Sequence, residues 1–391
     1  MQQKESSRLR LKRGKEKNVL HRHHWIYSGA VEEMPEALVA EVASSSGEVL
    51  GVAFLGQKGR SIAAHMVAFG SESLEDAIAK RIQSAIALRR QLFEPSVTNA
   101  YRLIHAEGDG LPGLIVDSYD GSLVLQISHP AWEEKKEFLL EQLIQQASPR
   151  AIFEKSTSFL RKKEGMKEVR ECLYGDRISQ VTILENGLQF HVDLLEGQKT
   201  GLFLDQREMR SLVRSLSNTR RVLNCFSYTG GFSVAALAGN AASVESVEIS
   251  GKCEKEGEKN ISLNHLPSNR HQFRCEDAID FVAKKPLPYD LVILDPPAFV
   301  KKKEDIGVAF RAYKELNRLA IQKMPAGSLL LTCSCSYHVS EELFQNILFR
   351  ASLEAGREVR ILENHRQAHD HPVSIFHPEG RYLKSCLLSI I

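Results

Sequence analysis

The sequence lacks any apolar run of the roughly 18–20 residues that a membrane span needs, so we expect no integral membrane protein. Its first twenty residues carry charge but no apolar core, so we expect no secretory signal. Cysteine is sparse: seven residues, an odd number without repeating spacing, do not form a disulfide framework and indicate a reducing, cytoplasmic location. The remaining composition, 43% hydrophobic and 26% charged, excludes disordered and fibrous classes.

Basic residues are concentrated at the start of the chain. Residues 1–24 hold eight lysines and arginines against two glutamates, which gives this segment a net charge of +6. The whole chain has a net charge of only +2, so the remaining residues are net negative. This pattern favours a nucleic-acid partner, although a solvated terminus explains the charge equally well. The same segment contains His21, His23 and His24, which we interpret as an edge contacting a base or phosphate. No cysteine or carboxylate follows at a zinc spacing, so we expect no metal.

The pattern of apolar residues divides the chain into three expected domains. In residues 1–70, short apolar stretches alternate with glycine and serine turns, which predicts a small barrel or sandwich. Residues 71–184 combine a helical spacing of Ile78, Ile82 and Ile86, with Arg89 on another face, and at least two strands, which predicts an α+β domain. Residues 185–391 alternate strands and helices.

That alternation is typical of βαβ units and predicts an α/β domain with a doubly wound parallel sheet. Two further apolar stretches near the end of the chain are expected to complete the sheet. Six strands are predicted with both ends, and a further strand, third along the chain, ends near Cys275. The six are Val222–Cys225, Val244–Ile249, Leu291–Leu294, Leu329–Thr332, Val359–Leu362 and Tyr382–Ile391.

The ends of the first three predicted strands indicate an adenosyl ligand. Gly230 and Gly231 stand at a strand-to-helix turn, but the G-x-G-x-x-G spacing of a pyrophosphate site is absent. Glu248 ends the second strand, where a carboxylate suits a ribose diol, and Asp277 follows the third, where an acid could accept from an adenine amino group. Either acid alone is more often a helix cap. Together they predict S-adenosylmethionine, which has a ribose but no phosphate.

The ends of the fourth and fifth predicted strands carry an acid and a thiol. Asp295 precedes two prolines, which force the chain to turn, so we expect Asp295 to face the methyl acceptor. Strand alternation places Cys333 and Cys335 on the same face. A free cysteine usually serves as a small, buried hydrophobic residue, and we interpret Cys333 in this way. Carbon 5 of cytosine accepts a methyl group only after a thiolate adds at C6 while an acid supports N3. Asp295 and Cys335 form the pair that this chemistry requires.

With these motifs the sequence resembles the class I methyltransferases that make 5-methylcytosine in bacterial large-subunit ribosomal RNA. Members of this family carry an N-terminal PUA domain and a middle connecting domain. The resemblance covers nearly the whole chain, and its combination of short motifs is highly specific. The matching blocks are His23–Gly29, Glu107–Leu114, Lys199–Arg207, Asn224–Phe232, Asp295–Phe299, Ser334–Ser336 and His371–Pro372.

The resemblance implies a Rossmann-like C-terminal domain, a small PUA β-barrel over residues 1–70 that binds ribosomal RNA, and a homodimer, with no membrane or metal partner. It implies S-adenosyl-L-methionine as the cofactor and S-adenosyl-L-homocysteine as the product. Cys335 is the implied nucleophile, and Asp295 its partner acid, which also borders the cofactor. The implied cofactor residues are Phe226, Ser227, Tyr228, Thr229 and Gly230 along the methionine part, Glu248 at the ribose, Asp277 at the adenine, and Asp205, Gln206 and Arg207 closing the pocket.

The sequence departs from this family in one respect that bears on the chemistry. Many RNA cytosine-C5 methylases have a second cysteine just after the fourth-strand motif, used for product release, but here that place reads Pro297-Ala298-Phe299. The base for the elimination step is therefore unassigned. Two alternatives stay open: a purine methylase in which Phe299 stacks on the base, and an RNA-binding assembly factor without catalysis.

Overall fold

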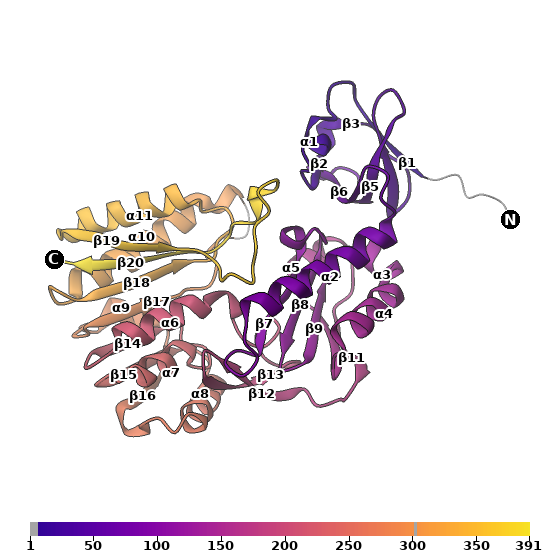
Figure 1. Ribbon diagram of the computed structural model, residues 1–391. Helices are drawn as coiled ribbons and strands as arrows, with labels where there is room; N and C mark the ends of the chain where they lie inside the picture. Colours follow the sequence, from indigo (N-terminus) through magenta and orange to yellow (C-terminus); the bar gives the residue numbers. More distant parts are fainter. Residues whose placement is uncertain (1–6, 301–302) are drawn as a thin grey trace. The chain divides into compact units, whose positions relative to one another are not determined.

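A computed structural model describes residues 7–300 and 303–391 (Figure 1). Lys4 and Glu5 of the basic segment lie outside the described residues. The chain divides into two compact units. The first runs to Ile183 and adds Val192–Leu204 and His369–Gly380, and the second holds Leu184–His191, Asp205–Ala368 and Arg381–Ile391. No helix within the described ranges has the length and apolar character of a membrane span.

The first unit begins with a six-stranded sheet in the order β2-β6-β5-β4-β1-β3, in which β1 and β4 are parallel and the other pairs antiparallel. Alternate residues such as Leu9, Leu11 and Val42 are fully buried in its core, because a strand directs successive side chains to opposite faces. The elements are β1 Arg8–Leu11, α1 Lys17–Leu20, β2 Trp25–Tyr27, β3 Val31–Glu33, β4 Val39–Ala43, β5 Val49–Leu55 and β6 Ile62–Phe69.

Of the three histidines before β2, His24 does not lie at the exposed edge that the sequence suggests, whereas His21 is exposed and His23 half-buried. His24 is buried, and its Nδ1 lies 2.9 Å from the carbonyl oxygen of Met66. Burial lowers its pKa to about 4, so the ring is neutral at physiological pH. The expectation that His24 contacts RNA is therefore wrong, because the strand pairing of β2 with β6 draws this residue into the core.

A second sheet of the same unit has the order β11-β10-β9-β8-β7. Helix α2 packs Ile78, Ile82 and Ile86 into the core of this sheet, as the apolar spacing predicts. Lys135 separates helix α3 from helix α4. The elements are α2 Leu74–Leu92, β7 Ala100–His105, β8 Leu114–Tyr119, β9 Ser122–Ile127, α3 Ala131–Glu134, α4 Lys136–Ala147, β10 Ala151–Ser156, α5 Phe159–Lys163 and β11 Val169–Gly175.

Arg89 of α2 does not lie on a polar face, so that expectation is wrong. It comes three residues after Ile86, which places it on the apolar face, and its side chain is fully buried. The guanidinium donates two bonds of 2.7 Å to the carboxylate of Asp109. It donates further bonds of 2.8 Å to the carbonyl oxygens of Arg102 and Asp370. This bidentate pairing compensates the buried charge.

The second unit contains a seven-stranded sheet in the order β16-β15-β14-β17-β18-β20-β19 (Figure 1). Strands β14 to β18 are parallel as expected, and only β20 runs against its neighbours β18 and β19. The six predicted strands agree with the structure within three residues at each end. The strands are β14 Arg221–Cys225, β15 Ser243–Glu248, β16 His271–Cys275, β17 Leu291–Leu294, β18 Leu329–Ser334, β19 Val359–His365 and β20 Lys384–Ile390.

Helices cover both faces of this sheet, which confirms the doubly wound arrangement. Leu223 and Cys225 of β14 pack with α9, α10 and α11, whereas Asn224 between them donates a 2.8 Å hydrogen bond to Ser233 of α7 on the other face. The carboxyl ends of the parallel strands therefore meet at one edge, where ligands bind in such folds. The helices are α6 Arg207–Leu216, α7 Gly231–Ala238, α8 Lys252–Leu263, α9 Ala278–Lys284, α10 Ile306–Lys323 and α11 Glu341–Ala355.

A hairpin of β12 (Gln180–Glu185) and β13 (Leu188–Asp193) joins the two units along the chain. Its turn residues, Asn186 and Gly187, have φ values of 50° and 77°, the left-handed conformation that a tight hairpin turn requires. The boundary expected at residues 184/185 falls inside this hairpin. The three-domain division stays a prediction.

Candidate active site at the carboxyl edge of the parallel sheet

The loop between β14 and α7 has an unusual backbone. Phe226, Tyr228 and Gly230 have φ values of 58°, 47° and 78°. For a residue with a side chain this left-handed region costs about 1–2 kcal/mol, and such strain is found where a backbone must be shaped for a ligand. The amide of Ser227 donates to the carbonyl oxygen of Val247 at 3.1 Å, which ties the loop to β15. Three of the five residues predicted here thus adopt a conformation that a simple helix start does not need.

Glu248 and Asp277 follow neighbouring strands, but the structure gives them different roles. Glu248 ends β15, and its carboxylate accepts the backbone N–H groups of Tyr228 at 3.0 Å and Ser250 at 3.1 Å. It therefore connects directly to the strained loop. Asp277 is exposed and caps α9 by accepting the amide of Asp280 at 2.9 Å. Asp277 is thus a helix cap, the more common role of an acid that follows a strand. Its contact with adenine stays a prediction.

Asp205, Gln206 and Arg207 are buried at the start of α6. The carboxylate of Asp205 accepts a 2.7 Å hydrogen bond from the hydroxyl of Tyr382, and its carbonyl oxygen accepts the amide of Ala368 at 3.0 Å. The Nε of Arg207 lies 3.8 Å from a carboxylate oxygen of Glu185. These contacts hold the segment within the second unit; its part in closing a pocket stays a prediction.

Strands β17 and β18 bring Asp295 and Cys335 to the same edge. The strands are parallel neighbours with Leu294 opposite Thr332, so Asp295 follows the first and Cys335 lies just beyond the second. The Sγ of Cys335 lies 3.9 Å from the carbonyl oxygen of Pro296, next in sequence to Asp295. Both side chains are partly exposed. The structure therefore places the predicted thiol beside the predicted acid's segment, within reach of a ligand.

The two cysteines of this region differ in their surroundings. Cys333 lies inside β18 and is fully buried. Burial, together with the nearby negative charge of Asp295, raises the pKa of its thiol well above the usual range. A thiol held in its neutral form is a poor nucleophile, which agrees with a packing role for Cys333. Cys335 lies beyond the strand, where alternation no longer decides which way a side chain points.

A lysine that the sequence analysis missed lies next to this thiol. Lys384 of β20 is buried, and its Nζ donates hydrogen bonds of 2.7 Å to the carbonyl oxygens of Ser336 and Tyr382. Burial lowers the pKa of Lys384 to about 8, while interaction with Cys335 acts in the opposite direction. The Lys384 side chain is held at the carbonyl oxygen of Ser336, next in sequence to Cys335. No short motif marks this lysine, because it reaches the site through antiparallel pairing of β20 with β18.

Comparison with known proteins identifies the fold around this edge. Residues 101–369 match the family model for S-adenosylmethionine-dependent methyltransferases, and residues 9–64 match that for PUA-like domains. Proteins named ribosomal RNA large subunit methyltransferase I from Yersinia pseudotuberculosis and Yersinia pestis are 40% identical over 387 residues, which covers 96% of this chain and 98% of theirs. The chain belongs to the S-adenosylmethionine-dependent methyltransferases.

Solved structures agree with the fold of this methyltransferase. A putative S-adenosylmethionine-dependent methyltransferase from Streptococcus mutans superimposes with a TM-score of 0.85 at 24% identity, covering 98% of this chain and all of that chain. A putative methyltransferase complexed with S-adenosylhomocysteine gives a TM-score of 0.86 at 23% identity, with the same coverage. The expected class I methyltransferase domain with an N-terminal PUA-like domain is confirmed.

The residues at the sheet edge suit S-adenosylmethionine, the cofactor of this methyltransferase. Ser227 is only 6% exposed, and its buried hydroxyl oxygen has no hydrogen-bond partner among the described residues. A buried polar atom without a partner is costly, and a ligand group seated on the loop would satisfy it. Ser227 would then hold the methionine part and Glu248 the ribose of the cofactor, which supplies a methyl group for transfer when bound.

Replacing Glu248 with glutamine is expected to weaken S-adenosylhomocysteine binding by about 10–100-fold. The charged carboxylate is lost, and hydrogen bonds to charged groups contribute about 1.5–3 kcal/mol. Isothermal titration with the purified methyltransferase measures the effect, and Glu258→Gln on the exposed side of α8 is the matched control. An affinity equal to that of the unmodified methyltransferase would remove Glu248 from the cofactor site.

The ring of Phe299 is partly buried and packs against Tyr313 of the core, with ring centroids 4.6 Å apart. The stacking of Phe299 on a purine stays a prediction of the alternative reading.

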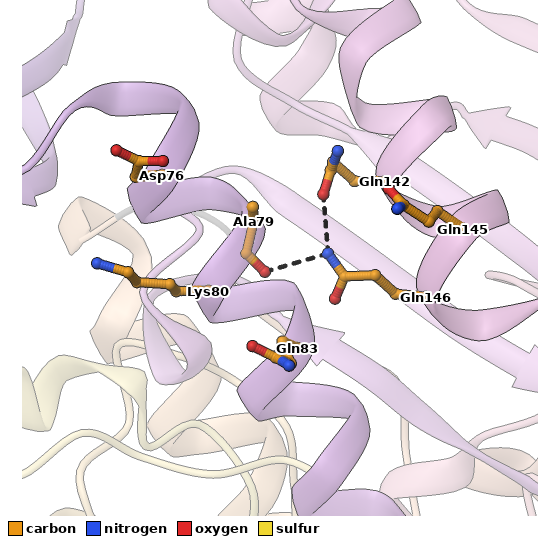
Figure 2. Close-up of a pocket in the computed structure, with 7 residues that line it drawn as sticks. All are labelled: Asp76, Ala79, Lys80, Gln83, Gln142, Gln145 and Gln146. Carbon is orange, nitrogen blue, oxygen red and sulfur yellow. Dashed lines mark hydrogen bonds between the residues drawn. The ribbon is translucent and has the colours of Figure 1, made fainter.

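A cavity of about 440 Å³ lies between α2 and α4 of the first unit (Figure 2). Gln146 in its lining donates to the carbonyl oxygen of Ala79 at 3.3 Å and to the side-chain oxygen of Gln142 at 2.8 Å. Four of its seven lining residues are glutamines, which neither donate nor accept a proton in catalysis, and we assign it no catalytic function.

Proposed function

We propose that this methyltransferase acts on large-subunit ribosomal RNA and methylates carbon 5 of cytosine through a covalent adduct with Cys335. The substrate class follows from 40% identity over the full length to proteins named ribosomal RNA large subunit methyltransferase I. The observation that carries the chemistry is the position of the Cys335 thiol, 3.9 Å from the carbonyl oxygen of Pro296, at an edge that also holds Asp295 and Lys384.

The reaction requires the thiolate of Cys335 to add to C6 of the cytosine while Asp295 supplies the acid that supports N3. The new C6–S bond makes C5 a nucleophilic, enamine-like carbon, which would take the methyl group that S-adenosylmethionine supplies when bound, leaving S-adenosylhomocysteine. Loss of the C5 proton to a base then breaks the C6–S bond and releases the thiolate. Lys384 supplies a positive charge near the thiolate at both ends of this cycle, since its ammonium group donates to the carbonyl oxygen of Ser336, the residue after Cys335. The base that removes the C5 proton is not assigned.

RNA binding is assigned to the PUA-like domain. The lysines and arginines of its first described segment lie with their side chains at the surface, where they can neutralise phosphates. Arg8 also pairs with Glu41 at 2.9 Å, so it contributes less charge than the others. The exposed members are Arg8, Arg10, Lys12, Arg13, Lys15, Lys17 and Arg22. A homodimer and a cytoplasmic location stay predictions.

Nucleoside mass spectrometry identifies the product. Purified methyltransferase is incubated with labelled S-adenosylmethionine and large-subunit ribosomal RNA that lacks its modifications, both free and in immature particles. We expect labelled 5-methylcytosine, because the thiol and the acid lie at one sheet edge. A labelled guanine or adenine would instead support the purine alternative, and no transfer to either form of the RNA would support the non-catalytic assembly factor.

A further inference from the structure

Three potential metal ligands from distant parts of the sequence lie together in the first unit. His23 precedes β2, whereas His377 and Glu379 belong to the segment His369–Gly380, which is part of the same unit. The Nε2 of His23 lies 3.2 Å from Oε2 of Glu379, and the Nδ1 of His377 lies 3.6 Å from the same oxygen. One ligand atom of each residue falls within 4.8 Å of the other two.

These separations agree with the geometry of a tetrahedral metal. Zn²⁺ binds imidazole nitrogen and carboxylate oxygen at about 2.0–2.1 Å, so two ligands of a regular tetrahedron lie roughly 3.3–3.4 Å apart. The two separations to Glu379 lie on either side of this value. Two imidazoles with one carboxylate suit zinc and similar transition ions, whereas calcium and magnesium prefer oxygen ligands alone.

His377 supplies an independent observation. Its residue is only 2% exposed, and its Nδ1 is buried without a hydrogen-bond partner in the described part of the chain. Its ring packs edge-on against Trp25 with centroids 4.5 Å apart, and its amide donates to the carbonyl oxygen of Ser374 at 2.9 Å. The ring is therefore fixed with an unsatisfied nitrogen toward Glu379. A buried polar atom of this kind calls for a partner.

His23 is held in place through its other ring nitrogen. Its Nδ1 accepts the backbone N–H of Trp25 at 3.1 Å and lies 3.2 Å from the carbonyl oxygen of the same residue. Its Nε2 faces the carboxylate of Glu379, with the two oxygens at 3.3 and 3.2 Å. A metal ion on Nε2 requires the ring proton on Nδ1, where it can donate to the carbonyl oxygen of Trp25, as metal-binding histidines commonly do. The side chains of His23 and Glu379 are 15% and 30% exposed, so an ion can enter from solvent.

We propose that His23, His377 and Glu379 bind one Zn²⁺ or similar transition-metal ion, with water in the fourth position. The ion would fasten the segment His369–Gly380 to the PUA-like domain, so its role is structural. The sequence predicts no metal because no further ligand follows His23 at a short zinc spacing. The proposed ligands His377 and Glu379 lie more than 350 residues further along the chain, so no local motif indicates the site.

Isothermal titration of the metal-stripped, full-length protein with ZnCl₂ tests this site. We expect one saturable site per chain, and the tetrahedral visible spectrum when Co²⁺ replaces Zn²⁺. Loss of an outer-shell contact typically costs 10–100-fold in metal affinity, so loss of a ligand in Glu379→Gln or His377→Gln should cost at least about 100-fold. His21→Gln is the matched control, because His21 is an exposed histidine of the same segment outside the cluster.

The metal-free melting temperature separates loss of the site from loss of the fold. The Glu379→Gln substitution is isosteric, and Glu379 is partly exposed. The variant should therefore have the same melting temperature as the unmodified, metal-free protein, but Zn²⁺ should no longer raise it. Absence of saturable binding to the unmodified protein would overturn the proposal. Binding that Glu379→Gln leaves unchanged would also overturn it, and would show that the three residues form only an ion pair with a neighbouring imidazole.

Discussion

Replacing Cys335 with alanine is expected to lower methyl transfer to large-subunit ribosomal RNA by at least about a thousandfold. Without the thiolate no bond forms at C6, and carbon 5 of cytosine remains too weak a nucleophile to accept the methyl group. The loss should appear in the rate of transfer and not in the affinity for S-adenosylhomocysteine. Incorporation of labelled methyl groups and isothermal titration measure the two quantities separately.

Cys333→Ala provides the matched control, since Cys333 is a fully buried thiol two residues away in β18. It should retain most of the activity after allowance for a small loss of stability. Ribosomal RNA containing 5-fluorocytosine should form a complex with the unmodified enzyme that survives denaturation, because fluorine cannot leave as a proton does. Cys335→Ala should form none. Full activity of Cys335→Ala, or a labelled purine that it still produces, would refute the covalent mechanism.

The site residues that the sequence predicts are those that belong to a local motif at the end of one β-strand. Glycines at a strand-to-helix turn, an acid after β15 and Asp295 before two prolines are local patterns, and a parallel sheet brings its strand ends to one edge. The fold therefore places Gly230, Glu248, Asp295 and Cys335 along one row from four separate motifs. Even so, Asp277 shows the limit of such reasoning, because an acid after a strand also caps the helix that follows it.

Residues whose role depends on a distant partner could not be predicted in this way. Lys384 reaches Cys335 only through the pairing of β20 with β18, and Glu379 reaches His23 from more than 350 residues away. Arg89 has a helical position that the apolar spacing marks as buried, yet a charge is expected outside unless its partner is known. In each case burial is stabilised by a long-range contact that has no local pattern.

Replacing Arg89 with methionine is expected to lower the free energy of unfolding of the first unit by about 3–5 kcal/mol. The change removes the guanidinium that pairs with Asp109 and leaves that carboxylate, only 7% exposed, without its counter-charge. It also removes the donors to the carbonyl oxygens of Arg102 and Asp370. Trp132 is buried in the same core, so its fluorescence during urea titration reports the unfolding of this unit.

Two further variants decide whether the charge or the packing of Arg89 is responsible. Arg90→Met changes the exposed neighbour on the same helix and should alter the unfolding free energy by no more than about 0.5 kcal/mol. The double variant Arg89→Met/Asp109→Asn removes both charges, while the introduced amide oxygen can still accept the backbone N–H of His105, so it should regain part of the loss. If the double variant is as unstable as Arg89→Met alone, the uncompensated carboxylate is not the cause. The lost donors to two buried carbonyl groups would then account for the effect, because unsatisfied buried acceptors carry a cost of their own.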